Sequence, residues 1–303
     1  MTYLRRLPKF AYAGPTTLSE VTALVADTAP GEILLLAGGT DAILQMRRRE
    51  RTPKTVVGLK GVAGLDGIAE ESDGGLTIGA TATLAALAAS PLVRRRFGLL
   101  AEAVLQIGGV ELRNVATIGG NVAGALPCAD LPPALMTLGA KVKLAGPKGA
   151  RWVALDEFFP EFSRTAAQPN EILAAIGLPK PAPGSAGTYL KFHDRHSMDM
   201  TVVGVAAFVT WDAKKKAVAE VRLAYANSAP TVMRARQAEA VLKGQAPSDD
   251  ALAACAEEAC KETKPRTSWR ANGAYRLELI RALTKRAIRR ACEKAQARPG
   301  DAP

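Results

Sequence analysis

Two glycine pairs in similar surroundings constrain this chain more than any other feature. The segment 34–41 reads LLLAGGTD, and the segment 116–124 reads ATIGGNVAG. Glycine lacks a Cβ atom, so the backbone at such a pair can approach another group closely and keep its amides within reach. We expect the two segments to converge on one ligand, and a phosphate or a ribityl chain would suit them. Each segment taken alone also fits an ordinary strand-to-helix turn.

The surroundings of the first pair favour an anion. Residues 33–36 form a continuous apolar run that predicts a buried strand, and a helix can begin near Asp41. A strand, a Gly-Gly turn and a helix leave free amides that point toward a negatively charged group. Upstream, Thr17 and Glu20 form a capping box that predicts a helix over about 18–28.

The remaining pattern predicts a mixed α/β first part and an α+β second part. Further strands are expected at 55–59, 76–78, 141–144, 151–154 and 171–176, with a helix from Pro91 to about 107. A proline-rich and glycine-rich stretch at 179–187 is the best linker. Strands at 188–192, 200–211 and 218–226 then precede helices at about 232–243, 249–262 and 273–295. We therefore expect two domains: 1–181, with two α/β subdomains that meet near 55–60, and 182–303, with a three-stranded sheet plus helices.

The charge of the chain is concentrated near its end. The net charge is +11, and residues 261–298 hold twelve Lys or Arg against three Glu. The last predicted helix places an apolar stripe opposite this basic face, with Ile280, Leu283, Ala287, Ile288 and Ala291 at helical spacing. A solvated face, a partner-facing surface and a nucleic-acid surface all fit such charge. Aromatic residues make up only 5% and no recognition motif is present, so we expect no nucleic acid.

Several well-known catalytic patterns are missing from the sequence. It contains no G-x-G, no P-loop, no G-x-S-x-G and no H-E-x-x-H. Its four cysteines, at 128, 255, 260 and 292, and its two histidines, at 193 and 196, form no close-spaced metal or cluster site. An imported cofactor or a binding role therefore fits better than self-contained hydrolase or metal chemistry.

Targeting signals are likewise missing. The N-terminus lacks the apolar segment of a secretory signal. No apolar run approaches the roughly 18 residues that span a bilayer. The expected location is cytoplasmic, without a membrane span.

Two polar positions stand out beside the glycine pairs. Asp130 precedes Leu131-Pro132-Pro133, where it can either cap a helix or bind a ligand. Lys191 lies in the polar stretch 189–199, which follows an apolar strand. A fixed cation there would stabilise negative charge on a phosphate or a reduced flavin ring, although dense charge also occurs at any exposed turn.

With these residues, the sequence resembles the FAD-binding, medium subunits of the molybdenum hydroxylases, the family of aerobic carbon monoxide dehydrogenases, bacterial xanthine dehydrogenases and 4-hydroxybenzoyl-CoA reductases. The resemblance covers nearly the whole chain. It is carried by AGGTD at 37–41, by TIGGN at 117–121 and by ADLPPA at 129–134, with support from EIL at 171–173, from Tyr189 and Lys191, and from AYR at 274–276.

The resemblance implies an FAD site. Its first segment comprises Leu36, Ala37, Gly38, Gly39, Thr40, Asp41 and Ala42, whose amides would hold the pyrophosphate. Its second comprises Thr117, Ile118, Gly119, Gly120 and Asn121, near the phosphate and ribityl region, with Asp130 on ribityl or ribose hydroxyls. Leu173 would pack near the cofactor, while Tyr189 and Lys191 would lie close to the isoalloxazine. The loop 192–199 would border the flavin.

The resemblance also implies partners. A small subunit would carry two [2Fe-2S] clusters and a large subunit the molybdenum cofactor, in a dimer of heterotrimers, and this chain would transfer electrons between the clusters and an external acceptor such as NAD or a quinone. The 4-hydroxybenzoyl-CoA reductase branch inserts a cluster-binding loop in the second motif region, whereas Asn121 and Asp130 are only nine positions apart here. We therefore do not expect the cluster-bearing form of that branch.

Alternatives are a stand-alone flavin oxidoreductase and a non-enzymatic scaffold or basic binding subunit.

Overall fold

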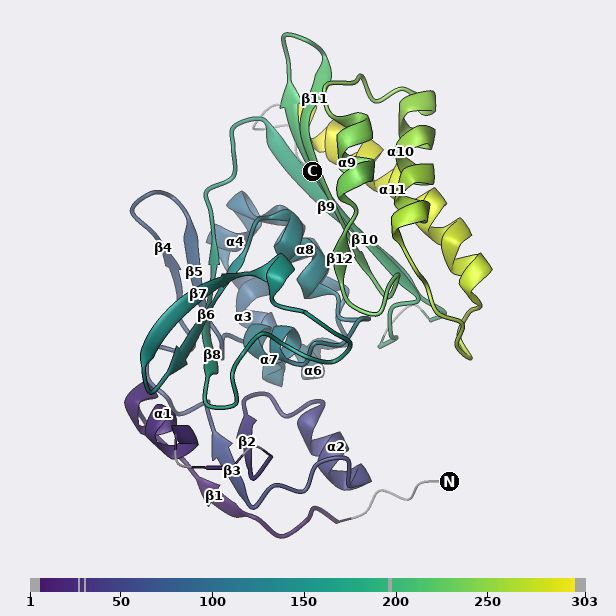
Figure 1. Cartoon of the computed structure of the whole chain (residues 1–303). Helices are drawn as coiled ribbons and strands as arrows, with labels where there is room; N and C mark the ends of the chain where they lie inside the picture. The colour runs from purple at the N-terminus through teal and green to yellow at the C-terminus, as the bar shows by residue number, and fades with distance from the viewer. Residues whose placement is uncertain (1–5, 27, 30, 196–197, 298–303) are drawn as a thin grey trace.

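Three β-sheets and their covering helices form the molecule. The computed structural model describes residues 6–26, 28–29, 31–195 and 198–297. Within these residues the sheets occupy successive parts of the sequence, with helices in the first two parts and helices alone after the third sheet (Figure 1). This arrangement confirms the predicted mixed α/β, α+β fold class.

The first sheet is small and parallel. Its strands are β1 (Ala11–Ala13), β3 (Thr55–Gly58) and β2 (Ile33–Leu36), in that spatial order. Helices α1 (Leu18–Ala26) and α2 (Ala42–Arg48) accompany them. The capping box of α1 forms as predicted, because the amide of Glu20 donates to Thr17 Oγ1 at 3.2 Å and Glu20 accepts from the amide of Thr17 at 3.4 Å. The first glycine pair leaves this sheet at the end of β2.

The second sheet is antiparallel and holds five strands in the order β4 (Ile68–Glu70), β5 (Leu76–Gly79), β8 (Ile172–Leu178), β6 (Lys141–Gly146) and β7 (Gly149–Ala154). Between β5 and β6 the chain forms α3 (Leu84–Ala89), α4 (Pro91–Arg96), α5 (Gly98–Leu105), α6 (Val110–Val115), α7 (Ile118–Ala123) and α8 (Leu131–Thr137). A short 3₁₀ turn, η1 (Leu155–Glu157), follows β7. The second glycine pair and Asp130 both belong to this helical layer.

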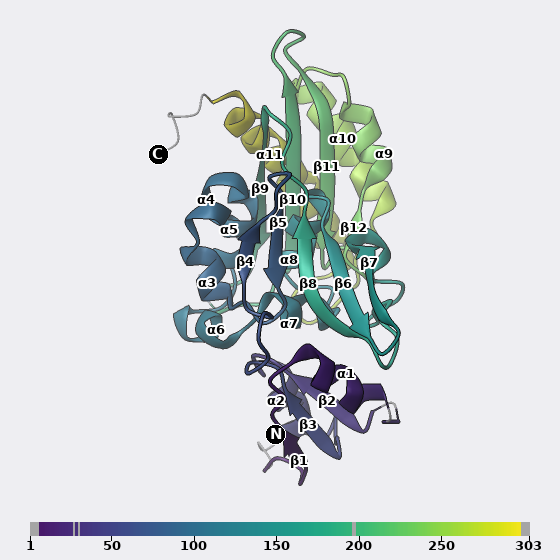
Figure 2. The same cartoon turned by 90° about the vertical axis from the view of Figure 1, so that its left-hand side faces the viewer.

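The third sheet is antiparallel, with the order β12 (Met233–Arg234), β11 (Ala217–Ala226), β10 (Val203–Asp212) and β9 (Ser185–Phe192). Helices α9 (Arg236–Leu242), α10 (Asp249–Glu262) and α11 (Gly273–Gln296) cover one face, and the layer of α5 and α8 covers the other (Figures 1 and 2). The apolar stripe predicted for α11 is buried against the sheet. The short strand β12 was not expected, since the sequence predicted three strands.

Two predicted elements differ from the structure because of tertiary contacts. The helix expected over 91–107 is divided at Phe97, whose backbone leaves helical geometry (φ −127°, ψ 47°) while its side chain enters the core, 1% exposed. The segment after Thr117, expected as a loop against a ligand, is the helix α7. Both differences follow from the burial of Phe97, Ile118 and Val122 in the same apolar core. The local sequence pattern does not show which distant residues form that core.

Candidate functional site

The structure brings the two glycine segments into direct contact. A Cβ atom at Gly38 would lie 2.3 Å from the carbonyl oxygen of Val115 and 2.8 Å from Cα of Ala116. Val115 and Ala116 lead straight into Thr117, so the first segment packs against the entrance of the second. Glycine at position 38 is therefore required by the chain itself, because any side chain would overlap this backbone.

The first segment presents unused amides. Gly39 has a left-handed backbone (φ +74°), and Asp41 occupies the N-cap position of α2 without a side-chain capping bond. Within the described part of the chain, no protein acceptor is found for the N–H groups of residues 38–41. Successive free amides around a left-handed residue form a concave anion-binding surface. Leu36, Ala37 and Ala42 instead pack against the apolar clusters beside the first sheet.

The second segment uses its two glycines differently. Gly119 packs on Ala80, whose carbonyl oxygen would lie 2.5 Å from a Cβ at position 119, and Ile118 is fully buried. Gly120 is exposed, and a Cβ there would meet only Thr117 Oγ1, at 2.9 Å. Thr117 caps α7 by accepting the amide of Gly120 at 3.1 Å. Gly120 is therefore the glycine of this pair that faces away from the protein core.

Two buried oxygens beside this segment lack a partner among the described residues, namely Asn121 Oδ1 and Thr81 Oγ1. Thr81 lies between Ala80, which packs on Gly119, and Thr83, which bridges to Thr117. A buried polar atom without a hydrogen bond costs about 1–3 kcal/mol. A ligand that supplies donors here would remove this cost. The sequence reading included Asn121 and missed Thr81, which carries no local signal.

Asp130 is a buried acceptor of three hydrogen bonds. Its Oδ1 accepts from the hydroxyl of Tyr189 at 2.7 Å and from the hydroxyl of Thr201 at 2.5 Å. Its Oδ2 accepts from Nζ of Lys191 at 3.0 Å. The side chains of Asp130 and Lys191 are 8% and 3% exposed. Asp130 stands at the N-cap position of α8, but its side chain makes no capping bond there, so the simple capping interpretation is wrong.

Lys191 is also fully bonded. Besides Asp130, its Nζ donates to the carbonyl oxygens of Gln106 and Asp199, each at 3.0 Å. An ammonium group has three N–H donors, and all three are used. The network thus joins α8, β9, the end of α5 and the loop after β9 around one buried ion pair.

Tyr189 remains a donor in this network. Burial raises the pKa of its phenol well above the usual value, and the negative charge of Asp130 raises it further. The phenol is therefore protonated throughout the neutral range, and its O–H stays directed at the carboxylate.

A cleft of about 410 Å³ opens beside Lys191. Gln106, Gly109, Arg113, Lys191, His193 and Met198 are among the residues that line it. Asp199 also borders the cleft. Burial raises the pKa of its carboxyl group, but hydrogen bonds from the amides of Arg195, Met200 and Asp194 lower it by more in total, so Asp199 is ionised at neutral pH. His196, which the sequence reading placed in this loop, lies outside the described residues.

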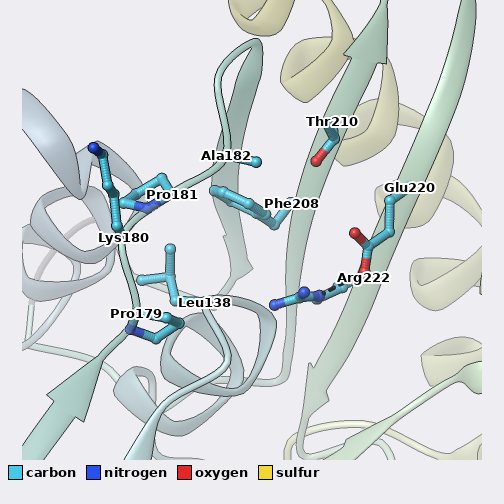
Figure 3. A pocket seen from close by; sticks show the side chains of 9 residues that line it. All are labelled: Leu138, Pro179, Lys180, Pro181, Ala182, Phe208, Thr210, Glu220 and Arg222. Carbon is cyan, nitrogen blue, oxygen red and sulfur yellow. Dashed lines mark hydrogen bonds and ion pairs between the residues drawn. The ribbon is translucent and has the colours of Figure 1, made fainter. Parts of the chain in front are cut away.

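A second, smaller cavity has a volume of about 150 Å³. It is formed where the stretch after β8 and residue Leu138 meet the third sheet, with Phe208 and Arg222 facing it (Figure 3). Arg222 pairs with Glu220 at 3.1 Å and contacts the carbonyl oxygen of Thr137 at 3.4 Å. None of the residues predicted for cofactor binding lines this cavity.

Leu173 lies in β8 and belongs to the core beneath the helical layer. The carbonyl oxygen of the next residue, Ala174, accepts the amide of Ala80 at 3.0 Å. Leu173 is therefore next in sequence to Ala174, which bonds to Ala80, and Ala80 is the residue on which Gly119 packs.

In the described residues, no group of three or more His, Cys, Asp or Glu could hold a metal ion, and the four cysteines are free.

Comparison with known proteins assigns this chain to a family. Residues 8–181 match the FAD-binding domain of molybdopterin dehydrogenases, and residues 188–291 match the C-terminal domain of the CO dehydrogenase flavoprotein. The xanthine dehydrogenase FAD-binding subunit of Escherichia coli O157:H7 is 32% identical over 94% of this chain and 97% of its own length. The carbon monoxide dehydrogenase medium chain of Afipia carboxidovorans is 33% identical over 95% of this chain and 98% of its own length.

A solved structure agrees in three dimensions. A chain of carbon monoxide dehydrogenase from Hydrogenophaga pseudoflava, in a form that lacks the Mo-pyranopterin moiety of the molybdenum cofactor, superposes with a TM-score of 0.91 at 32% identity. The match covers 96% of this chain and all of that one.

The protein is thus an FAD-binding oxidoreductase subunit. It belongs to the medium-subunit family of the CO dehydrogenase and xanthine dehydrogenase type of molybdenum hydroxylase. No helix in its described residues is long and apolar enough to cross a membrane.

The contact at Gly38 can be tested by adding one methyl group. Gly38→Ala is expected to lower the free energy of unfolding by about 1–3 kcal/mol, because the neighbouring backbone cannot move away cheaply. Gly98→Ala is the matched control, since a Cβ there meets nothing within 4 Å. Urea denaturation followed by circular dichroism measures both. Equal stability of the two variants would show that the segments do not pack as described.

The buried pair allows a second test. Lys191→Met should reduce the free energy of unfolding by about 3–5 kcal/mol, because it leaves the Asp130 carboxylate buried without its cation. Arg164→Met removes the partner of Glu161 in an exposed ion pair and should leave stability almost unchanged. The double variant Asp130→Asn/Lys191→Met should lose less than the sum of the single variants. Strict additivity in urea denaturation would argue against the pair.

Proposed function

We propose that this chain is the FAD-carrying electron-transfer subunit of a molybdenum-containing hydroxylase complex. In this proposal a small subunit with two [2Fe-2S] clusters and a large subunit with the molybdenum cofactor complete a heterotrimer, which pairs as a dimer. The family membership and the names of the relatives, FAD-binding subunit and medium chain, support it. The observation that carries it is the contact between the two glycine segments, with amides on the first and buried oxygens on or beside the second that have no partner among the described residues.

The described residues fit FAD. The amides of residues 38–41 would hold the pyrophosphate, and Thr117, Gly120 and Asn121 would contact the phosphate and ribityl region. FAD, when bound, exchanges electrons singly and in pairs, which allows it to connect one-electron clusters with a two-electron acceptor. We also propose that residues 1–181 form the FAD-binding domain and residues 182–303 the C-terminal domain.

Asp130 keeps one place for a ligand. A carboxylate offers about four acceptor positions, and three are used by Tyr189, Thr201 and Lys191. The remaining position on Oδ2 suits a ribityl or ribose hydroxyl. The donors of Lys191 are all engaged, so its effect on the isoalloxazine would come from its positive charge and its place beside the cleft.

The proposal predicts a simple spectroscopic result. The full-length chain should purify with, or take up, stoichiometric FAD, which its visible absorption reports. Gly120→Val should remove FAD binding while the circular dichroism spectrum stays unchanged, because residue 120 is exposed and its side chain would project where the cofactor is proposed. Gly67→Val is the control, since Gly67 is likewise exposed and, within the described residues, a Cβ there meets nothing within 4 Å. A colourless chain that cannot take up FAD would refute the proposal.

The partners are tested separately. Native mass spectrometry of the complex isolated from its own cells should find this chain with an iron–sulfur subunit and a molybdenum subunit. The isolated chain should pass electrons from reduced FAD to an acceptor but should not oxidise an organic substrate. Turnover of such a substrate by the isolated chain would instead identify a stand-alone flavin oxidoreductase.

A further inference from the structure

The strand that carries Tyr189 and Lys191 lies at the edge of its sheet. Strand β9 pairs with β10, and within the described residues no other strand adjoins it. An edge strand leaves every second residue with backbone groups that face no neighbouring strand. Tyr189 and Lys191 stand two residues apart, so their side chains leave the same face of β9, toward Asp130.

Two charged side chains occupy the open edge. Glu102 of α5 accepts the amide of Tyr189 at 3.3 Å and the hydroxyl of Thr188 at 2.8 Å through its Oε2. Lys294, in the last turn of α11, contacts Oε1 of Glu102 and donates to the carbonyl oxygen of Gly187 at 3.3 Å. The pair thus offers an acceptor to one edge amide and a donor to the edge carbonyl two residues before it. A neighbouring strand would offer the same two groups.

The environment of the pair favours such a role. The side chains of Lys294 and Glu102 are 33% and 30% exposed, so they are partly shielded from water and ions. Gly187 lets β9 approach α5 closely, because a Cβ there would lie 2.9 Å from Leu99 Cδ2. Glu102 is therefore held beside the strand by the packing of its own helix.

We propose that Glu102 and Lys294 form an edge clamp that positions Tyr189 and Lys191 on Asp130. They are positioning residues, since they bond to backbone groups of β9 and to the hydroxyl of Thr188, and act on the side chains of Tyr189 and Lys191 only through the strand. The consequence for flavin binding rests on the function proposed above, whereas the clamp itself does not. This gives the basic final helix a specific task in the fold, in which one of its cations completes the edge of the third sheet.

The clamp differs from an ordinary ion pair in its directionality. Reversal of both charges, Glu102→Lys with Lys294→Glu, keeps the attraction between the two side chains. It also places a donor opposite the amide of Tyr189 and an acceptor opposite the carbonyl of Gly187, where neither can bond. An ordinary ion pair survives the reversal, and an edge clamp does not.

Hydrogen–deuterium exchange of the full-length chain without FAD tests the clamp directly. In Glu102→Ala and in Lys294→Met, the amide of Tyr189 should exchange about tenfold faster, the factor expected when a hydrogen bond to a charged network is lost. The dissociation constant of FAD, from fluorescence quenching, should rise in both variants. The reversed double variant should stay as impaired as the single ones. Arg289→Met, which removes another ion pair of α11, should behave like wild type.

Every other result of these measurements contradicts either the clamp, its positioning role or the proposed function. Unchanged exchange in Lys294→Met, or recovery in the reversed variant, overturns the clamp. Faster exchange with wild-type FAD affinity overturns its positioning role. If wild type binds no FAD, the proposed function fails and the positioning of a flavin fails with it, while the exchange data still decide the clamp. Should Glu102→Ala not fold, Thr188→Val removes the hydroxyl that donates to Glu102 and accepts from Lys294 at 3.5 Å, and it must still speed exchange at Tyr189.

Discussion

The burial of Asp130 with Lys191 constrains the whole centre of the molecule. Moving a carboxylate and an ammonium out of water costs several kcal/mol for each ion, and the cost is offset only if the ions pair closely and accept or donate further hydrogen bonds. Here the carboxylate accepts three bonds and the ammonium donates three. Those bonds require α8, β9 and the end of α5 to hold fixed relative positions. The bonds of this ion pair therefore fix the arrangement of these elements within the folded chain itself.

The glycines of the site show that one residue type serves different purposes. Gly38 and Gly119 admit protein backbone, Gly39 adopts a left-handed conformation, and Gly120 faces outward. The sequence reading attributed both pairs to close approach of a ligand. The structure assigns two of the four to close approach of the chain to itself, which is what brings the segments together. The free amides of residues 38–41 follow from this packing, because the turn is held where its N–H groups meet no acceptor among the described residues.

Local signals predicted local structure well. Strand β2 occupies residues 33–36 and helix α10 residues 249–262, as expected, and the amide of Ala251 donates to Ser248 as a helix cap requires. The family resemblance and the fold class also followed from short motifs. In contrast, Thr81 and Thr201 could not be found, because an isolated threonine carries no pattern. The division of a helix at Phe97 depended on a core formed by distant strands.

The charge of the final helix is in part paired within the fold, which composition alone does not reveal. Twelve basic residues against three acidic ones at 261–298 suggested a solvated or partner-facing surface. In the structure Arg281, Arg289 and Lys294 are each paired with a carboxylate from another helix, and Arg276 is 1% exposed, with burial lowering its pKa. Part of the positive charge therefore balances carboxylates within the fold. Because α11 packs on β10 and β9 and carries Lys294 in its last turn, this one cation connects the C-terminal helix with the strand that carries Tyr189 and Lys191.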